Sequence, residues 1–331
     1  MNEAPGGASA SPLIRAATPA AIAEAAAVLQ DGGLVAFPTE TVYGVGADAT
    51  RNEAVARLFR AKGRPSNNPL IVHVADRDAA AAVTDLGPTA DALARRFWPG
   101  PLTLVVPRGT ACPVSGLVTT GLDTVALRVP DHPVALALLG AAGLPVAAPS
   151  ANRSGRLSPT AAAHVTNGLG PLVDFILDGG ECRIGIESTV VAVADSTVRI
   201  LRQGGVPHEV LVDALGDTLV DAEHTGAPLA PGMLPTHYAP RARLRLNANS
   251  VSAEEGLVAF GGDAPAGAKC MRNLSPAGDL GEAANRFYAA LRELDDEGVG
   301  IIAVVPIPEV GMGRAINDRL RRAAAPRGEA R

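Results

Sequence analysis

Two strand-like segments that follow one another directly place the tightest constraint on the fold of this chain. Residues 189–193 and 198–201 are short β-branched runs with only a brief, mostly polar stretch between them, which leaves no room for a helix. A strictly alternating, doubly wound parallel sheet needs a helix after each strand. We therefore expect an α/β fold with a twisted sheet that mixes parallel and antiparallel strands, flanked by helices.

Further strand signals recur through the first two thirds of the chain, and helices are expected between some of them. The strand signals are apolar or β-branched runs at residues 34–37, 70–74, 102–107, 124–129, 145–148 and 173–177. Cap-then-proline patterns predict helices after Thr18, Asp131 and Ser158. An apolar stripe that ends at glycine and proline predicts another over residues 52–62.

The length of 331 residues predicts roughly two domains, because a typical domain has ~150 residues. We expect a disordered tail at 1–12, a main α/β domain at 13–211, a linker at 212–243 where the apolar periodicity fades, and a small Rossmann-like α/β domain at 244–325. Inside this last domain, strand signals at 257–260 and 301–305 alternate with helical patterns at 280–294 and 314–324.

Charge and cysteine content argue against several classes of protein. Lys+Arg 29 against Asp+Glu 34 give a net charge of −5, so no overall positive field holds nucleic acid. Cys112, Cys182 and Cys270 lie far apart without a C-x-x-C pair, which fits neither a disulfide framework nor a zinc module. No run reaches the ~18 apolar residues of a membrane span, and no basic start precedes an apolar core. We expect a cytoplasmic protein.

Residues 62–68 form a turn that is rich in hydrogen-bond donors. Lysine occurs only at Lys62 and Lys269, so Lys62 beside Arg64 indicates a need for a compact ammonium next to a guanidinium. With Asn67 and Asn68, these side chains suit phosphate oxygens or a carboxylate. The alternative for Lys62 is a last-turn lysine that complements the helix dipole.

Polar segments also follow several predicted strands. Hydroxyls, amides, backbone N–H groups and a guanidinium occur at residues 38–46, 149–155, 158–160, 187–189 and 202–205, and anions suit such donors. Gly44 and Gly46 lack the third glycine of a dinucleotide fingerprint, and no G-x-x-x-x-G-K-[ST] motif is present. Each segment alone also fits a polar turn or a surface charge, so it is their joint placement at strand ends that favours a binding site.

The histidines argue against protein-held metal and against a hydrolase triad. A structural role is the default interpretation of His73, which alternates with apolar neighbours on a predicted strand. The other histidines form no H-E-x-x-H motif and no i, i+4 pair: His132, His164, His208, His224 and His237. None neighbours a serine or cysteine in a nucleophile elbow.

Together these segments resemble the L-threonylcarbamoyladenylate synthase family in its long, two-domain form. The resemblance spans nearly the whole chain, at residues 38–46, 62–73, 99–103, 124–133, 149–160, 185–190, 231–240, 274–276 and 311–320. It implies that L-threonine and bicarbonate give N-carboxythreonine, which attacks the α-phosphate of ATP and releases pyrophosphate. The product, threonylcarbamoyl-AMP, would pass to the tRNA threonylcarbamoyl transferase machinery.

The resemblance also assigns roles to residues and segments. It implies that 13–211 is the catalytic domain, that the linker folds over the active site, and that ATP carries the Mg²⁺ on its phosphates. Lys62 and Arg64 would supply catalytic charge. The threonine side would comprise Thr41, His73, Arg128, the main chain near Ala148, and Ser188. The ATP side would comprise Arg64, Asn68, Thr124, Ser150, Asn152, Ser158, Arg202 and, from the linker, Tyr238.

The linker departs from the family pattern at Leu234, Pro235 and Thr236, where the family usually has a basic residue and an aromatic. Pro235 should stiffen this segment. One alternative function is an RNA-binding module of the same fold without adenylate synthesis, against which the negative net charge counts. Another is a related enzyme acting on carbamoyl phosphate, whose usual cysteine clusters do not occur in this sequence.

Overall fold

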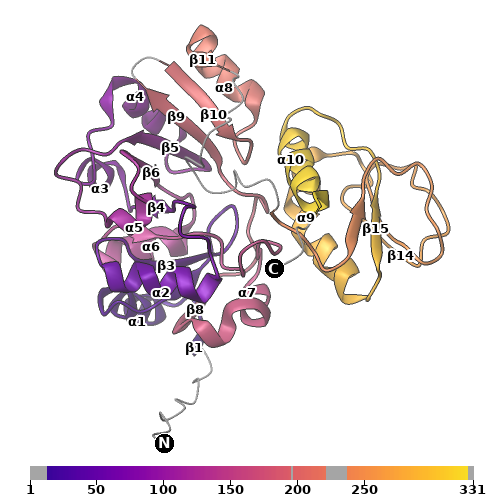
Figure 1. Cartoon of the computed structure of the whole chain (residues 1–331), viewed down its shortest axis with the longest axis horizontal. Helices are drawn as coiled ribbons and strands as arrows, with labels where there is room; N and C mark the ends of the chain where they lie inside the picture. The colour runs from indigo at the N-terminus through magenta and orange to yellow at the C-terminus, as the bar shows by residue number, and fades with distance from the viewer. Residues whose placement is uncertain (1–12, 195–196, 221–236, 327–331) are drawn as a thin grey trace, which may run out of the picture.

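The computed structural model describes residues 13–194, 197–220 and 237–326. Figure 1 shows two α/β bodies: a larger one that begins near the amino terminus and a smaller one, in orange and yellow, near the carboxyl end. The predicted tail at 1–12 and the linker positions Leu234, Pro235 and Thr236 lie outside these described residues. No helix within the described ranges is long and apolar enough to cross a membrane.

In the described chain, 11 strands form the mixed sheet of the larger body. In spatial order these are β1 (Leu13–Ala16), β8 (Phe175–Asp178), β2 (Val35–Phe37), β3 (Gly44–Asp48), β7 (Val146–Ala147), β4 (Ile71–His73), β6 (Thr124–Arg128), β5 (Leu102–Pro107), β9 (Thr189–Ala194), β10 (Thr197–Arg202) and β11 (Leu219–Val220). Strands β9 and β10 pair antiparallel, whereas β4 with β6 and β5 with β9 pair parallel. The predicted mixed sheet is confirmed.

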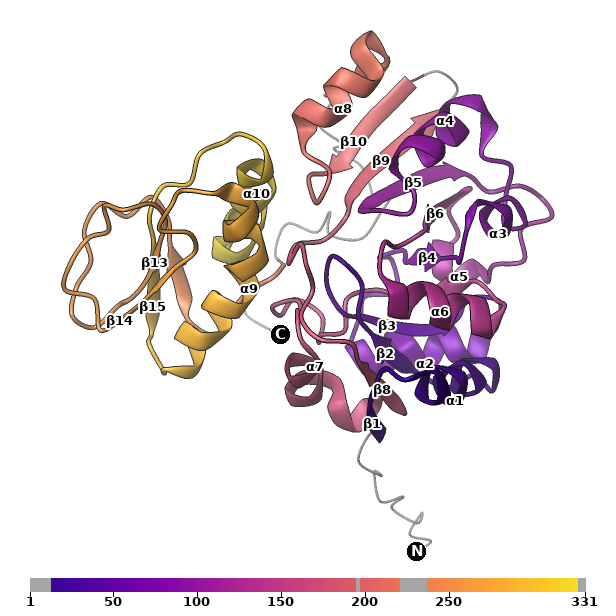
Figure 2. The same cartoon turned by 180° about the vertical axis from the view of Figure 1, so that it is seen from behind.

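Helices cover both faces of this sheet, as Figures 1 and 2 show from opposite sides. On one face lie α1 (Pro19–Gln30) and α6 (Pro133–Ala142). The opposite face carries α2 (Asn52–Lys62), α4 (Gly87–Phe97), α5 (Gly116–Thr119) and α7 (Ala162–Leu169), while α3 (Arg77–Ala81) and η1 (Gly170–Leu172) are short connecting turns. In β2, Val35 and Phe37 pack in the core under α1 and α6, and Ala36 packs in the core under α2, α4, α5 and α7. Successive side chains of a strand point to opposite faces of the sheet.

The ends of α1 and α2 follow the predicted capping chemistry. The Thr18 hydroxyl accepts a hydrogen bond from the Ala21 N–H (3.2 Å), and α2 ends where Gly63 takes a left-handed conformation (φ 60°). Glycine adopts that conformation at little steric cost. The chain therefore turns sharply from α2 into the loop that carries Arg64.

Two helix starts differ from the prediction. His132, not Asp131, caps α6 with its ring nitrogen, because Asp131 forms an ion pair elsewhere. Ser158 caps no helix: α7 begins only at Ala162, and the Ser158 hydroxyl donates to Glu187 (2.6 Å). In both places a long-range polar partner takes the side chain that the local pattern assigned to a cap.

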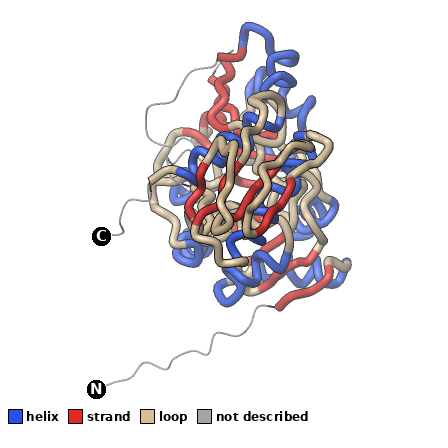
Figure 3. Tube along the Cα trace, turned by 90° about the vertical axis from the view of Figure 1, so that its right-hand side faces the viewer, coloured by secondary structure: helices blue, strands red, loops and turns tan. Residues whose placement is uncertain are grey.

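The smaller body is built on a parallel sheet, which confirms the predicted second α/β domain. Its described strands lie in the order β12 (Arg243–Arg245), β15 (Ile301–Val304), β13 (Gly256–Ala259) and β14 (Cys270–Asn273), with helices α9 (Leu280–Asp296) and α10 (Met312–Ala324). Figure 3 shows these strands side by side with this body facing the viewer. The sequence did not predict β12 and β14, which are short, partly exposed and carry arginines.

Part of the segment predicted as linker belongs to the larger body instead. Helix α8 (His208–Leu215), the 3₁₀ turn η2 (Gly216–Thr218) and strand β11 follow β10 directly, and β11 pairs in parallel with it. Helix α8 buries Leu211 and leaves most of its surface exposed. Its apolar periodicity is therefore weak, and the sequence pattern missed it.

The two bodies meet in a shared core and in one very close main-chain contact. Leu157 and Ile186 of the larger body pack in one cluster with Phe287 of α9. A Cβ atom added to Gly185 (φ 77°) would lie 2.4 Å from the Asn285 main-chain oxygen, a distance that no side chain tolerates. The seam between the bodies therefore requires glycine at this position.

Candidate active site

Polar side chains from separate segments meet where β4 and β6 end, near the middle of the large sheet. These parallel neighbours bring His73 and Arg128 side by side in register. The short strand β7 flanks β4, and Ala148 and Ser150 follow it. A cavity of about 50 Å³ lies here. The predicted residues among those that line it are Thr41, Arg64, His73, Arg128, Ala148, Ser150, Ser188, Arg202 and Tyr238.

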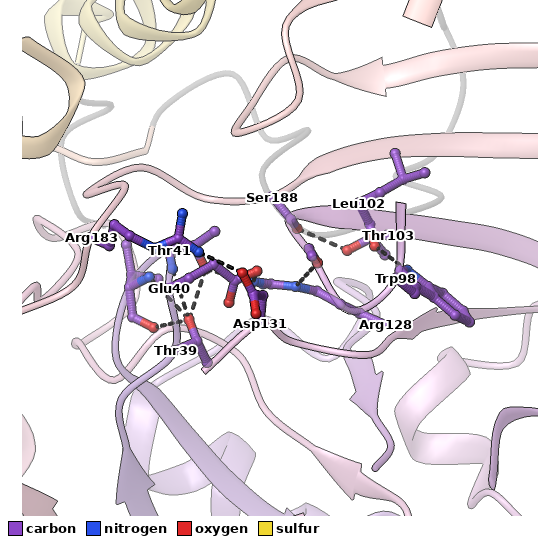
Figure 4. A network of polar contacts seen from close by, with 12 residues as sticks. Thr39, Glu40, Thr41, Trp98, Leu102, Thr103, Arg128, Asp131, Arg183 and Ser188 are labelled. Carbon is purple, nitrogen blue, oxygen red and sulfur yellow. Dashed lines mark hydrogen bonds and ion pairs between the residues drawn. The ribbon is translucent and has the colours of Figure 1, made fainter. Parts of the chain in front are cut away.

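Arg128 is held at the cavity by a buried counter-ion. Its Nη2 lies 2.7 Å from Glu40 Oε1 and donates to the Thr41 hydroxyl (3.0 Å), while its Nε donates to the Gly100 carbonyl (3.2 Å). Figure 4 shows these side chains converging from residues 39–41 and β6. The side chains of the pair are only 4% and 0% exposed. Arg128 is therefore fixed in place as a planar donor that suits a carboxylate.

Ser188 and Arg202 form a second fixed pair, at the start of β9 and the end of β10. The Arg202 guanidinium donates to the Ser188 carbonyl from Nε (3.1 Å) and Nη2 (2.8 Å), and to the Ser188 hydroxyl (3.0 Å). The Thr103 hydroxyl lies 2.8 Å from that of Ser188 (Figure 4). Burial lowers the pKa of Arg202, because it disfavours the charged form. A bound anion beside the guanidinium would stabilise that charged form.

Arg64 is the third buried guanidinium at the cavity. It donates to the Asn68 carbonyl (2.9 Å), the Asn68 side-chain oxygen (2.7 Å) and the Pro69 carbonyl (2.7 Å). Burial lowers the pKa of Arg64 to about 9, and the like charge of Arg202 acts in the same direction. Asn68 thus acts on the site by orienting Arg64. Two mutually repelling guanidinium groups favour a ligand with several negative charges.

Lys62 lies beside the cavity without lining it. Its ammonium donates to the carbonyls of Ser150 (2.5 Å) and Asn152 (2.6 Å), and the side chain is 2% exposed. Burial and the nearby Arg64 lower its pKa well below the ordinary value. Lys62 and Arg64 are both buried, so neither is a solvated surface charge. In this structure Lys62 holds the 150–152 turn.

Two neutral histidines complete the lining. Burial lowers the pKa of His73 and of His237 to about 3 each, and nearby arginines act in the same direction: Arg128 on His73 and Arg64 on His237. The His73 ring packs edge-on against Phe37. At neutral pH both rings are uncharged, so they offer hydrogen-bonding atoms without adding positive charge.

Three of the predicted nucleotide residues besides Asn68 do not line the cavity of the described structure: Thr124, Asn152 and Ser158. Thr124 begins β6, and its side chain lies on the same face of the strand as that of Arg128. At ~3.3 Å per residue, the four steps between them span about 13 Å. Asn152 donates to the carbonyls of Arg153 (2.8 Å) and Arg156 (2.8 Å) and shapes the turn. The Ser158 hydroxyl donates to Glu187, which lines the cavity.

Several residues that line the cavity were given no role from the sequence, and the two with ionisable side chains are Glu187 and His237. Each directly precedes a residue that was assigned, Ser188 and Tyr238. The polar segments noticed in the sequence therefore lie directly beside both residues. Nothing in the neighbouring sequence, however, indicates that the Glu187 side chain is buried. Tyr238 is 2% exposed with φ 63°, a left-handed conformation that aims this side chain at the cavity.

Metal ligands do not gather anywhere in the described ranges. Within 13–194, 197–220 and 237–326, no three His, Cys, Asp or Glu side chains are placed to hold a metal ion. The donor set at the cavity consists of arginines, hydroxyls, main chain and neutral histidines. It suits anionic substrates.

The fold and the site define a two-domain α/β protein whose central cavity is lined by buried arginines and suits anionic ligands. Residues 27–204 match the family Sua5_yciO_yrdC, described as "Telomere recombination", and residues 203–325 match "Threonylcarbamoyl-AMP synthase, C-terminal domain". The chain is 43% identical over 324 residues to the threonylcarbamoyl-AMP synthase of Bacillus subtilis, covering 92% of this chain and 93% of the relative. It is 41% identical to that of Pyrococcus abyssi, covering 91% and 93%. The chain belongs to the threonylcarbamoyl-AMP synthase family.

A solved structure supports the same assignment. The crystal structure of P. abyssi Sua5 complexed with L-threonine is 37% identical in sequence, with a TM-score of 0.85, and the match covers 95% of this chain and 97% of that one. The match extends over both bodies. The mixed sheet and the smaller parallel domain are therefore the family fold.

The buried ammonium of Lys62 generates the first prediction. Lys62→Met should lower the free energy of unfolding by about 3 kcal/mol, because two buried carbonyls lose their donor. Urea denaturation measures the loss. The matched control is Lys269→Met, which replaces the chain's other, exposed lysine and should change stability little. Equal losses in the two variants would contradict the structural role.

The neutral histidines predict acid sensitivity. The pKa of His73 and of His237 is about 3 in the folded protein, against about 6.5 when unfolded. Between these values the unfolded chain binds more protons, so the free energy of unfolding falls as the pH falls below about 6.5, by about 1.4 kcal/mol per pH unit per histidine. The urea midpoint of unfolding should fall less steeply with decreasing pH for His73→Asn than for the wild type. An identical slope for the two proteins would refute the assignment of this acid sensitivity to His73.

Proposed function

We propose that this protein makes threonylcarbamoyl-AMP and pyrophosphate from L-threonine, bicarbonate and ATP, in the cavity between β4, β6 and Tyr238. The observation that carries the proposal is the convergence of three buried guanidinium groups, those of Arg64, Arg128 and Arg202, on one small cavity. The substrates bring a triphosphate and carboxylates, so the site needs fixed cations and N–H donors. The curated relatives named threonylcarbamoyl-AMP synthase support this reaction.

The threonine side centres on Arg128. Its guanidinium would bind the amino-acid carboxylate, with the hydroxyls of Thr41 and Ser188 and the main chain at Ala148 around it. His73, neutral at physiological pH, would accept or donate a hydrogen bond without competing for the carboxylate. The crystal structure of the P. abyssi relative complexed with L-threonine supports a threonine site in this family.

The ATP side centres on Arg64 and Arg202. Their charges would face the phosphates, and Ser150 and the turn that Lys62 holds would contribute hydroxyl and N–H donors. Thr124, about 13 Å from Arg128 along one face of β6, would bind the far end of an extended nucleotide. Mg²⁺ would arrive bound to the phosphates, because Glu187, an acidic residue that lines the cavity, is already engaged by Ser158, Tyr288 and Arg319.

The reaction then needs positioning rather than a covalent nucleophile. The carbamate oxygen of N-carboxythreonine attacks the α-phosphorus of ATP. A new P–O bond forms there, while the bond to the β-phosphate oxygen breaks and pyrophosphate leaves. Arg64 and Arg202 would stabilise the charge that develops on the phosphate oxygens.

The size of the cavity implies an opening step. Small-molecule sites enclose roughly 300–1,000 Å³, whereas this cavity measures about 50 Å³. Admission of ATP would require Tyr238 and His237, which form one wall, to move outward. Their return would shield the reactive mixed anhydride from water.

We further propose that the product passes to the tRNA threonylcarbamoyl transferase machinery and that the protein acts in the cytoplasm. Weak RNA binding at an arginine-rich surface is the second candidate function. RNA binding without ATP turnover, weakened steeply by salt, would favour that alternative.

An assay of pyrophosphate release tests the proposed function. Incubation with L-threonine, bicarbonate, Mg²⁺ and ATP should release pyrophosphate, and leaving out threonine or bicarbonate should abolish it. Mass spectrometry should detect threonylcarbamoyl-AMP in the complete mixture. Release that does not depend on threonine would disprove the proposal.

Two conservative substitutions should separate the substrate sides. Arg128→Lys should raise the KM for threonine roughly ten-fold or more, because lysine lacks the planar fork that binds a carboxylate. Arg64→Lys should raise the KM for ATP instead. Steady-state kinetics with each substrate varied in turn measures both. If each variant raised the KM for threonine and the KM for ATP equally, the separation of the site into a threonine side and an ATP side would be wrong.

A further inference from the structure

The carboxylate of Glu187 joins the two bodies at the wall of the cavity. It is 6% exposed and lines the cavity. From the larger body it accepts a hydrogen bond from the Ser158 hydroxyl (2.6 Å). From the smaller body it accepts a hydrogen bond from the Tyr288 hydroxyl, whose oxygen lies 2.9 and 3.0 Å from the two carboxylate oxygens, and another from Arg319 Nε (3.0 Å).

Arg319, on α10, reaches the site from the smaller body. Its side chain is 0% exposed, and its Nη1 donates to the Gln203 carbonyl (2.7 Å) and to Asp318 (2.7 Å). Its guanidinium carbon also lies 5.2 Å from the centre of the Tyr238 ring. One side chain thus contacts both the buried carboxylate and the aromatic wall of the cavity.

The charges around Glu187 keep it ionised. Burial alone would raise the pKa of this carboxyl, but Arg319 and then Arg202 outweigh that effect, and the Ser158 hydrogen bond adds to theirs, so the pKa lies at about 2. The titratable groups that act on it are Arg319 from α10, Tyr288 from α9, Arg202 from β10, and the neighbours His237 and Tyr238. Without Arg319, the carboxylate would be buried against two phenols with the more distant Arg202 as its cation.

We propose that Arg319 is a positioning residue of the synthase reaction, which acts through Glu187 on Ser158 and holds Tyr238 against the cavity. The smaller body is then part of the active site. This inference rests on the proposed function, because it names a further residue for that reaction.

A clamp that only joins the two bodies would not need these features. Replacing a buried ion pair by apolar side chains is often neutral or stabilising, so such a pair is weak evidence of a role in stability. Exposed pairs such as Arg314 with Glu209 already bridge the bodies. The placement of Glu187 and Arg319 beside Ser158 and Tyr238 instead indicates orientation of the nucleotide side.

The full-length enzyme tests this with Arg319→Met, Arg319→Lys and a matched control, Arg321→Met, whose side chain lies on the same helix and is 59% exposed. Arg319→Met should lower kcat/KM for ATP by about 10- to 100-fold, with a smaller change in the KM for threonine. The acid limb of its kcat/KM profile should move to higher pH, because Glu187 loses its counter-ion. The kcat/KM of Arg319→Lys for ATP should lie between those of the wild type and Arg319→Met. The acid limb of its kcat/KM profile should stay near that of the wild type. Arg321→Met should match the wild type.

A double variant separates positioning from folding. In a Glu187→Gln background there is no buried carboxylate for Arg319 to neutralise, so adding Arg319→Met should lower kcat/KM by less than about three-fold further, which is the part that Arg319 contributes through Tyr238. The same loss in both backgrounds would overturn the proposal, as would an Arg319→Met enzyme with the wild-type kcat/KM and pH profile. Pyrophosphate release by the wild type, measured alongside, shows separately whether the proposed function holds.

Discussion

The buried, ionised carboxylate of Glu187 ties the larger body, the smaller body and the cavity together. An ionised carboxylate can leave water only when cations and hydrogen-bond donors surround it. Here those partners come from distant segments: Ser158 from the turn before α7, Tyr288 from α9 and Arg319 from α10. Satisfying one carboxylate therefore fixes the turn beside the cavity and the orientation of the smaller body at the same time.

The positive side of the site follows a related rule. Each guanidinium is held by a different set of acceptors: a carboxylate for Arg128, carbonyl and amide oxygens for Arg64, and a main-chain carbonyl with a hydroxyl for Arg202. These bonds hold the three guanidinium groups in place, and the two histidines stay neutral. A fixed array of donors stabilises developing charge more effectively than mobile surface cations would.

Sequence patterns predicted the mixed sheet and the smaller domain because these depend on local apolar runs and on the missing helix between β9 and β10. They did not reveal β3, where Gly44 and Gly46 look like turn residues. In the fold, a Cβ atom on Gly46 would lie 2.7 Å from a Val146 methyl carbon, so glycine there permits close packing within a strand. The partners of Lys62 and Glu187 were likewise invisible, because they lie 29 to 132 positions away along the chain.

The narrow seam at Gly185 and the buried acid two positions later have a joint evolutionary consequence. A lineage that discarded the smaller body of such a chain would remove the contact between α9 and Gly185, although the φ of 77° would still favour glycine at this position. The same deletion would remove both Tyr288 and Arg319 from Glu187. Gene shortening and replacement of that acid by an uncharged residue should therefore be inherited together.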